Sequence, residues 1–148
     1  MTIIQKNPKD ASAVILHHNG NVLLQKRDNK EGIFYPGYWG LFGGARNKKE
    51  MYLTNIKREI YEELNLDLNK KNFKYFFKLK IEFPISKKKF KFVNRFFYIY
   101  EIQNISKLKN QIILREGQKF SFFDKIKYLK LQITPYDRFA LDLFFKFV

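Results

Sequence analysis

Apolar residues near the start of the chain form two short runs separated by a tight-turn signal. Ser12–Leu16 is the first run and Val22–Leu24 is the second. Between them lies Asn19-Gly20, the dipeptide most typical of a two-residue hairpin turn. We therefore predict a β-hairpin here. The following segment, Lys26–Gly40, is polar at first and then rich in glycine and aromatic residues, which is typical of a loop.

A helical pattern comes after this loop. From about Lys49 to Leu64, apolar residues recur every three or four positions, so one side of a helix would be buried. That stripe consists of Leu53, Ile56, Ile60 and Leu64. Asn65 follows directly, and Asn is the best residue after Gly for the left-handed conformation in which many helices end.

The second half of the chain contains further extended patterns and one more helical one. Apolar and polar residues alternate over Phe77–Phe83, which predicts a strand with one solvated face. Phe90–Ile102 is expected to pair with it in an antiparallel arrangement, and shorter strands are predicted at Ile112–Leu114 and Lys119–Phe123. Pro135–Phe147 predicts a helix, because Pro suits an early helical position and Phe139, Leu143 and Phe147 recur at helical spacing. Such an order describes a mixed sheet covered by helices.

Composition narrows the class of protein. The 148 residues are expected to form a single domain, residues 1–148, and the hydrophobic fraction of 45% argues for a folded globule. There is no cysteine, which suits a reducing compartment. No run reaches signal-peptide length or the roughly 20 apolar residues of a membrane span. We therefore expect a cytoplasmic protein without a membrane partner.

The net charge of +15 leaves two interpretations open. A basic face could bind nucleic acid or another polyanion. Alternatively, the lysines are spread along the chain beside abundant Asn, Ile, Phe and Tyr, a combination typical of AT-rich coding sequences, and they merely solvate the surface. The cluster Lys87–Lys91 interleaves charge with an aromatic residue, but it falls in the predicted hairpin loop. Nucleic acid is therefore a partner that the charge permits and does not require.

The chemistry of the chain is concentrated in Gly44–Leu66. Glu59, Glu62 and Glu63 lie on one face of the predicted helix, where like charges repel by a few tenths of a kcal/mol per pair. A divalent metal ion is the obvious group to bind such a cluster, because carboxylate oxygens are hard ligands.

This segment resembles the Nudix box, the signature of the Nudix hydrolases, which reads Gly-x5-Glu-x7-Arg-Glu-(apolar)-x-Glu-Glu-x-Gly-(apolar). The residues in register are Gly44, Glu50, Arg58, Glu59, Ile60, Glu62, Glu63 and Leu66. Asn65 replaces the last glycine, a mild departure at the end of a helix. The resemblance implies an α/β fold, namely the Nudix-type α/β/α sandwich with a mixed β-sheet.

The resemblance also implies a reaction and a set of site residues. Nudix enzymes cleave a nucleoside diphosphate linked to another moiety by attack of water on phosphorus, and they use Mg²⁺, with Mn²⁺ as an alternative. The implied catalytic residues are Glu59, Glu62 and Arg58, with Glu59 or Glu62 as general base and Arg58 orienting a glutamate. The implied metal ligands are the Gly43 carbonyl, Glu59, Glu62, Glu63 and Glu116. Glu116 is chosen because mutator-type members carry a similar Glu-Gly-Gln, and Glu101 is the second choice.

The loop before the box supplies candidates for substrate binding. Tyr35, Tyr38 and Trp39 could stack on a nucleobase, or they could pack the loop. Lys26 and Arg27 could reach substrate phosphates, or they could simply end a strand in solvent. His17 and His18 are interpreted as strand-end residues without a catalytic role.

No motif selects one substrate. A nucleoside triphosphate or a nucleotide sugar is the expected small-molecule substrate. The alternatives are an RNA 5′-end pyrophosphohydrolase, for which the positive charge would grip the polymer, and a Nudix-fold module that binds nucleotide or RNA without cleaving it. The oligomeric state stays open, with a homodimer as one alternative.

Overall fold

The computed structural model of the protein describes residues 8–148. A mixed β-sheet runs through the middle of the molecule. Its strands are β1 (Ala11–His18), β2 (Asn21–Lys26), β3 (Trp39–Gly40), β4 (Phe42–Ala45), β5 (Phe73–Pro84), β6 (Phe90–Glu101) and β7 (Lys119–Phe123). The main path is β3-β2-β1-β6-β5, with β4 paired to β1 and β7 paired to β2. β1 and β6 run parallel, whereas the other paired strands are antiparallel.

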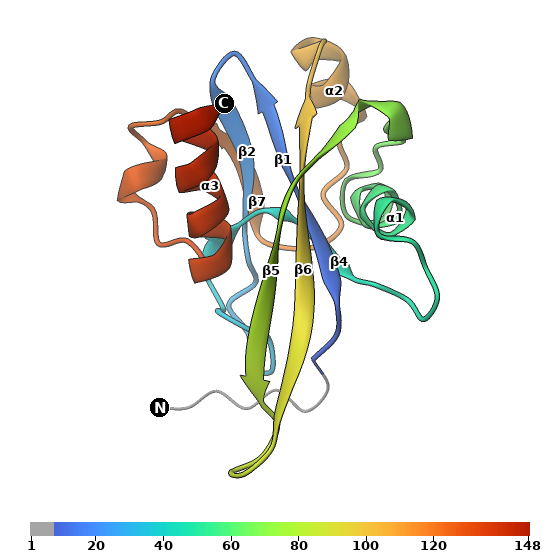
Figure 1. The fold of residues 1–148 in the computed structure, drawn as a ribbon. Coiled ribbons are helices and arrows are strands. Elements are labelled where there is room, and N and C mark those ends of the chain that lie inside the picture. The colour runs from blue at the N-terminus through green and yellow to red at the C-terminus, as the bar shows by residue number, and fades with distance from the viewer. Residues whose placement is uncertain (1–7) are drawn as a thin grey trace.

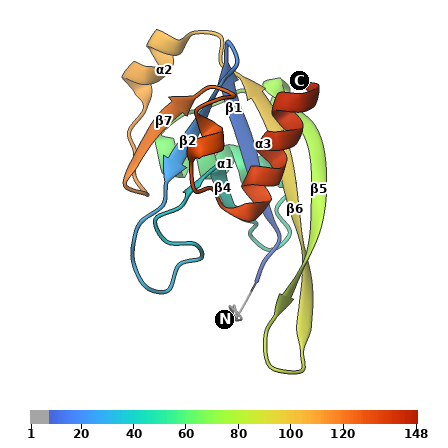
Figure 2. The ribbon, with the colours of Figure 1, turned by 90° about the vertical axis from the view of Figure 1, so that its left-hand side faces the viewer.

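Helices cover both faces of this sheet (Figures 1 and 2). They are α1 (Tyr52–Leu64), α2 (Ile105–Gln111) and α3 (Pro135–Phe147), with 3₁₀ turns η1 (Lys70–Asn72) and η2 (Tyr128–Lys130). Alternate residues of β1 point to opposite faces: Val14 packs in the core beneath α1, and Ile15 packs in the core beneath α3. The predicted α/β/α sandwich is therefore confirmed. No helix of residues 8–148 is long and apolar enough to span a membrane.

The first hairpin forms where the turn signal predicts it. Asn19 and Gly20 connect β1 to β2 and have φ values of 48° and 78°. Two consecutive positive φ values match the right-handed twist of the paired strands, which explains why Asn-Gly occupies the turn.

Helix α1 ends as predicted. Asn65 adopts the left-handed conformation at φ 59° and ψ 29°, and its backbone N–H donates to the carbonyl of Tyr61. The buried face of α1 differs from the predicted stripe. It contains Ile56, Ile60 and Leu64, but Leu53 is only half-buried, and the polar residues Asn55 and Glu63 are buried as well.

One predicted element is wrong and one helix was missed. Ile112–Leu114 is not a strand; it follows α2, where the Asn104 side chain caps the first turn by accepting from the Lys107 N–H. Only Leu108 of α2 is buried, so the helix leaves no apolar stripe in the sequence. The backbone N–H of Ile113 instead donates to the carbonyl of Leu64, which satisfies an open group at the end of α1.

The predicted strand pair β5–β6 and the predicted helix α3 are both present. In α3 the buried residues are Asp137, Ala140, Leu141 and Phe144. Phe139 and Phe147, which carried the helical spacing, are exposed. The helix was therefore predicted from residues that do not make its buried face.

Candidate active site

A buried carboxylate lies where α1 crosses β4. Glu63 is 3% exposed, and its Oε1 accepts a hydrogen bond of 3.0 Å from the Gly43 N–H. Its Oε2 accepts one of 3.0 Å from the Gln25 side-chain amide of β2. Burial, together with the nearby charge of Glu59, raises the pKa of Glu63 to about 8. The fold thus holds this carboxyl group in a buried position where ionising it costs free energy.

A second carboxylate is packed against the glycine turn. A Cβ atom at Gly44 would lie 2.4 Å from the Glu59 carboxyl carbon, so no other residue type fits there without displacing Glu59. Burial raises the pKa of Glu59, the Arg58 charge opposes that shift, and Glu62 and Glu116 add to it. The Gly44–Glu59 spacing of the box therefore has a direct steric cause in this chain.

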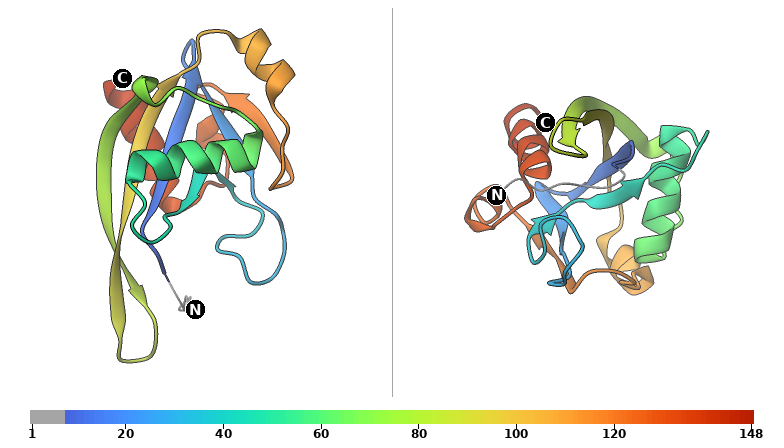
Figure 3. Two further views of the ribbon diagram at one scale, coloured as in Figure 1. Left: turned by 90° about the vertical axis from the view of Figure 1, so that its right-hand side faces the viewer. Right: turned by 90° about the horizontal axis from the view of Figure 1, so that it is seen from below.

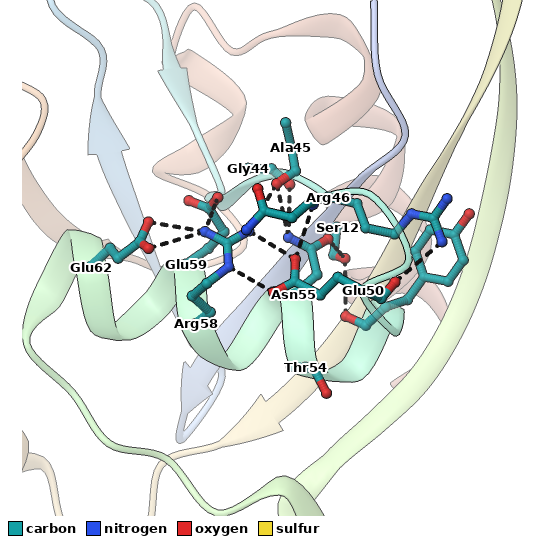
Figure 4. A network of polar contacts seen from close by, with 12 residues as sticks. Ser12, Gly44, Ala45, Arg46, Glu50, Thr54, Asn55, Arg58, Glu59 and Glu62 are labelled. Atoms are coloured by element: carbon teal, nitrogen blue, oxygen red, sulfur yellow. Dashed lines mark hydrogen bonds and ion pairs between the residues drawn. The ribbon is translucent and has the colours of Figure 1, made fainter.

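Arg58 joins the remaining glutamates of the box (Figure 4). Its Nε and Nη2 donate to Glu50 at 2.7 and 2.9 Å, and its Nη1 donates to Glu59 at 3.1 Å and to Glu62 at 3.1 Å. Nη2 also donates to the Ala45 carbonyl at 3.0 Å. Its hydrogen bonds to the Glu50 carboxylate raise the pKa of Arg58, so the guanidinium stays charged. It fixes the exposed Glu62 and the half-buried Glu59 relative to each other.

Two residues that the sequence did not single out support this arrangement. The fully buried Asn55 donates to the carbonyls of Gly44 and Ala45 at 3.3 and 3.2 Å, and its side-chain oxygen accepts from the Ser12 hydroxyl. Gln25 holds Glu63, as described above. The signal that could have found Asn55 is its spacing of four and eight residues before Glu59 and Glu63, which places it on the same row of the helix.

The structure places Glu116 near the glutamates and Glu101 far from them. Glu116 lies in the loop before β7, and its charge raises the pKa of both Glu59 and Glu63. The next residue, Gly117, has φ +83° and packs against Gln25, which fixes the loop at the end of β2. Glu101 instead ends β6 opposite His17, away from β4 and α1.

A cavity of about 310 Å³ borders the same glycine turn. Its lining includes Gly43, Gly44 and two of the predicted substrate-binding residues, Arg27 and Tyr35. Burial lowers the pKa of Arg27, and the nearby charge of Asp137 opposes that shift. A ligand in this cavity would therefore lie beside the glycine turn that contacts Glu59 and Glu63.

The other three substrate-binding candidates do not line this cavity. Trp39 packs edge-on against Phe123, with ring centroids 4.9 Å apart, so it serves the core rather than the cavity. Tyr38 contacts Tyr35 at 5.2 Å between ring centroids. Lys26 contributes its backbone carbonyl, which accepts from the Gln118 N–H.

Arg95 and Asp137 are cavity residues that the sequence analysis missed. Arg95 Nη2 donates to Asp137 Oδ1 at 2.9 Å. Asp137 Oδ2 accepts from the Leu41 N–H and from the Thr134 hydroxyl. These contacts join β6, the start of α3 and the segment before β4, so the cavity wall is built from distant parts of the chain.

The donor set can be tested for its fit to a divalent metal ion. Within residues 8–148, no group of three or more His, Cys, Asp or Glu side chains is arranged to hold a metal, and Arg58 occupies Glu59 and Glu62 with its own hydrogen bonds. The chemistry of the residues nevertheless fits Mg²⁺, which prefers hard oxygen ligands. Glu59 and Glu63 repel each other in a buried setting, and a dication would relieve that repulsion.

Comparisons with known proteins agree with this geometry. The family model described as NUDIX domain matches residues 6–142. A MutT NUDIX hydrolase from Burkholderia pseudomallei superimposes with a TM-score of 0.71 at 19% identity, covering 92% of this chain and 97% of that one. The E. coli dihydroneopterin triphosphate pyrophosphohydrolase gives 0.73 at 15% identity, covering 99% and 100%.

A third similar structure is a complex with a nucleotide derivative. The NUDIX domain of Shewanella oneidensis NrtR, complexed with ADP ribose, gives a TM-score of 0.69 at 12% identity and covers 93% of this chain and 86% of that one. No curated protein matches the chain. At these identities the solved structures establish the fold and leave the substrate open.

Proposed function

The chain belongs to the Nudix hydrolase family, whose members hydrolyse nucleoside diphosphate derivatives, and we propose that it is a Mg²⁺-dependent pyrophosphohydrolase of a nucleoside triphosphate or a nucleotide sugar. The observation that carries the proposal is the pair Glu59 and Glu63. Both carboxyl groups are held against Gly43-Gly44 with raised pKa values, and the same turn borders the cavity. A structural role alone does not explain why the buried Glu63 lies beside the half-buried Glu59, whose charge repels it.

The metal would be held by the carboxylates around the glycine turn. The proposed ligands are the Gly43 carbonyl, Glu59, Glu62, Glu63 and Glu116. When bound, Mg²⁺, or Mn²⁺ in its place, supplies positive charge that neutralises phosphate oxygens and makes water more acidic. This requirement is strong here, because a pyrophosphate cannot approach several carboxylates without a cation between them.

The protein's own residues would orient the groups and move the proton. A water oxygen forms a bond to phosphorus, the anhydride P–O bond breaks, and the leaving phosphate keeps the electron pair. Glu59 or Glu62 takes the proton from the water, since both are more accessible than the buried Glu63. Arg58 is a positioning residue, because it holds both glutamates at 3.1 Å through one nitrogen.

The cavity would receive the moiety attached to the pyrophosphate. Its volume of about 310 Å³ is at the lower end of the range for small-molecule sites. Tyr35 and Phe34 supply aromatic walls for a base or sugar, and Arg27 supplies positive charge for a phosphate. Of the five residues proposed to bind substrate, the cavity therefore favours Arg27 and Tyr35.

A substrate panel tests the proposal. Wild type, Glu62→Gln and the matched control Glu101→Gln are incubated with nucleoside triphosphates, nucleotide sugars, dinucleoside polyphosphates and 5′-triphosphate RNA, in Mg²⁺, Mn²⁺ or EDTA. We expect turnover of a small nucleotide by wild type and Glu101→Gln, with a loss of at least about 100-fold in Glu62→Gln and in EDTA. Tight binding without turnover of any compound would overturn the enzyme and leave a binding module. Turnover restricted to RNA would overturn the small-molecule substrate.

A further inference from the structure

The β5–β6 hairpin projects beyond the rest of the sheet (Figures 1 and 3). Each of its strands has 12 residues, but β1 pairs with β6 only from Arg95 to Glu101. The outer part of β6, Phe90–Asn94, therefore has β5 as its ladder partner and lacks one on the other side among residues 8–148. This ribbon lies at the edge of the sheet and is accessible to a partner.

The hairpin carries a large share of the positive charge. Residues 73–100 contain seven lysines, one arginine and a single carboxylate, Glu82, so they hold +7 of the net +15 in 28 of 148 residues. Arg95 pairs with Asp137, whereas none of the seven lysines forms an ion pair with the described residues. The charge is thus concentrated here, and an even spread of lysines through the chain does not account for it.

One face of the hairpin presents aromatic rings together with these lysines. The strand register pairs Glu82 with Phe92 and Lys78 with Phe96, which places alternate residues of both strands on the same face. Phe90 and Phe92 on this face are 57% and 55% exposed. Lys80 Nζ lies 4.6 Å from the ring centroid of Phe92, and Lys78 Nζ lies 5.8 Å from that of Phe96.

The aromatic face continues to the active site. Tyr52, the first residue of α1, stacks on Phe96 with ring centroids 3.7 Å apart, and the Arg46 guanidinium lies 4.7 Å from the Tyr52 ring centroid. Arg46 also donates to the carbonyl of Glu50, the residue that Arg58 holds. A ligand on this face would therefore extend along the hairpin toward the glutamates.

We propose that this hairpin face, formed by Lys78, Lys80, Phe90 and Phe92 with the loop lysines Lys87–Lys89, binds single-stranded nucleic acid. Exposed rings with adjacent cations suit unpaired bases, which stack on aromatic side chains while lysines neutralise the phosphates. A duplex keeps its bases stacked inside and cannot use the rings. An acidic protein would use the lysines without requiring aromatic rings. A membrane would insert the rings away from the charged groups, whereas here Lys80 lies beside the Phe92 ring on the same face, which favours an unpaired base next to its phosphate.

Fluorescence anisotropy tests the proposal without relying on hydrolysis. A labelled 20-nucleotide single-stranded RNA is titrated with the protein in EDTA at several salt concentrations, with a 10-base-pair duplex, which carries about the same number of phosphates, as competitor. The ring variant is Phe90→Ala/Phe92→Ala, and Phe147→Ala is its control for loss of an exposed ring. The charge variant is Lys87→Gln/Lys88→Gln/Lys89→Gln, and its control for lost charge is Lys125→Gln/Lys127→Gln/Lys130→Gln. Thermal melts and turnover of a small nucleotide check that each variant is folded.

We expect the Phe90/Phe92 variant to weaken RNA binding at least about fivefold, since each base stack contributes that much or more. The Lys87–Lys89 variant should reduce the slope of log K against log salt by about 2, because three phosphate contacts each contribute about 0.7. Equal losses in the two lysine triples with no effect of the rings would overturn the proposal in favour of unspecific attraction. Preference for the duplex, or hairpin-dependent binding to polyglutamate or to phosphatidylserine vesicles without RNA binding, would also overturn it.

Discussion

The burial of Glu63 makes a stability prediction that can be worked from the structure. The pKa of this carboxyl is raised from 4.5 to about 8 in the folded protein. A raised folded-state pKa contributes stability that is fully present below the unfolded value of 4.5 and is lost as the pH rises toward 8. Between pH 4.5 and pH 7, about 2.5 pH units, the unfolding free energy falls by about 1.36 kcal/mol per unit, or about 3 kcal/mol in all.

The perturbation is Glu63→Gln, which keeps the size of the side chain and cannot ionise. In EDTA, the unfolding free energy of wild type should fall by about 2–3 kcal/mol between pH 5 and pH 7 relative to that of the variant. The variant also changes the hydrogen bond with Gln25, but that effect does not depend on pH. Urea unfolding followed by the fluorescence of Trp39, the single tryptophan, measures the difference.

Metal ions give the same experiment a second arm. Mg²⁺ binds the ionised carboxylate and not the protonated one, so it should restore the stability of wild type at pH 8 and leave Glu63→Gln much less affected. Glu101→Gln is the control for loss of an exposed carboxylate outside the proposed metal site. Parallel pH profiles of wild type and Glu63→Gln in EDTA would refute the reasoning, because burial would then impose no cost on the charged form.

Three further outcomes follow from single contacts. Gly44→Ala should lower kcat/KM about 100-fold with the fold retained in circular dichroism, because the new Cβ would lie 2.4 Å from the Glu59 carboxyl carbon and would displace it. Arg58→Lys should lower the unfolding free energy by about 1–3 kcal/mol and reduce kcat, since an ammonium group cannot reproduce the fork of hydrogen bonds to three glutamates; an unchanged urea midpoint would contradict this. Asp10 is partly buried, which opposes ionisation, but hydrogen bonds from the Asn94 N–H and a tyrosine hydroxyl hold its pKa below 3.8. The stability that ionised Asp10 contributes is therefore present above pH 3.8 and lost below it. The difference in unfolding free energy between wild type and Asp10→Asn should be constant from pH 5 to 7 and should shrink in melts at acid pH.

The sequence predicted those parts of the molecule whose structure is encoded locally. Asn19-Gly20 specifies its own turn, and Asn65 specifies the end of its helix, because each depends on the backbone preference of one or two residues. The fixed spacing of the box likewise reflects contacts between β4 and the adjacent helix α1. For these features the residues that interact are close in the sequence.

The features that sequence reasoning missed depend on contacts between distant segments. Asp137 becomes a cavity residue because it receives hydrogen bonds from Leu41 and from Arg95, 96 and 42 residues away. The sequence left open whether Trp39 stacks on a base or packs within the protein, and only its contact with Phe123, 84 residues away, places it against the core. Helix α2 has a single buried residue, so no periodic pattern marked it. The periodic pattern of apolar and polar residues does not show which distant residues will come into contact.

The acidic site and the basic surface have complementary effects on a phosphate substrate. The positive field of a protein with net charge +15 attracts polyanions over long distances and raises their local concentration. At short range a substrate at the proposed site would meet Glu59, Glu62 and Glu63. Arg58 neutralises only part of that charge, since it contacts Glu59 and Glu62, whereas Glu63 is held by the Gly43 N–H and Gln25. If the proposed cation is bound, the surface charge governs how fast a substrate arrives and the cation governs how it binds at the glutamates. Salt should slow association, whereas loss of metal should prevent productive binding.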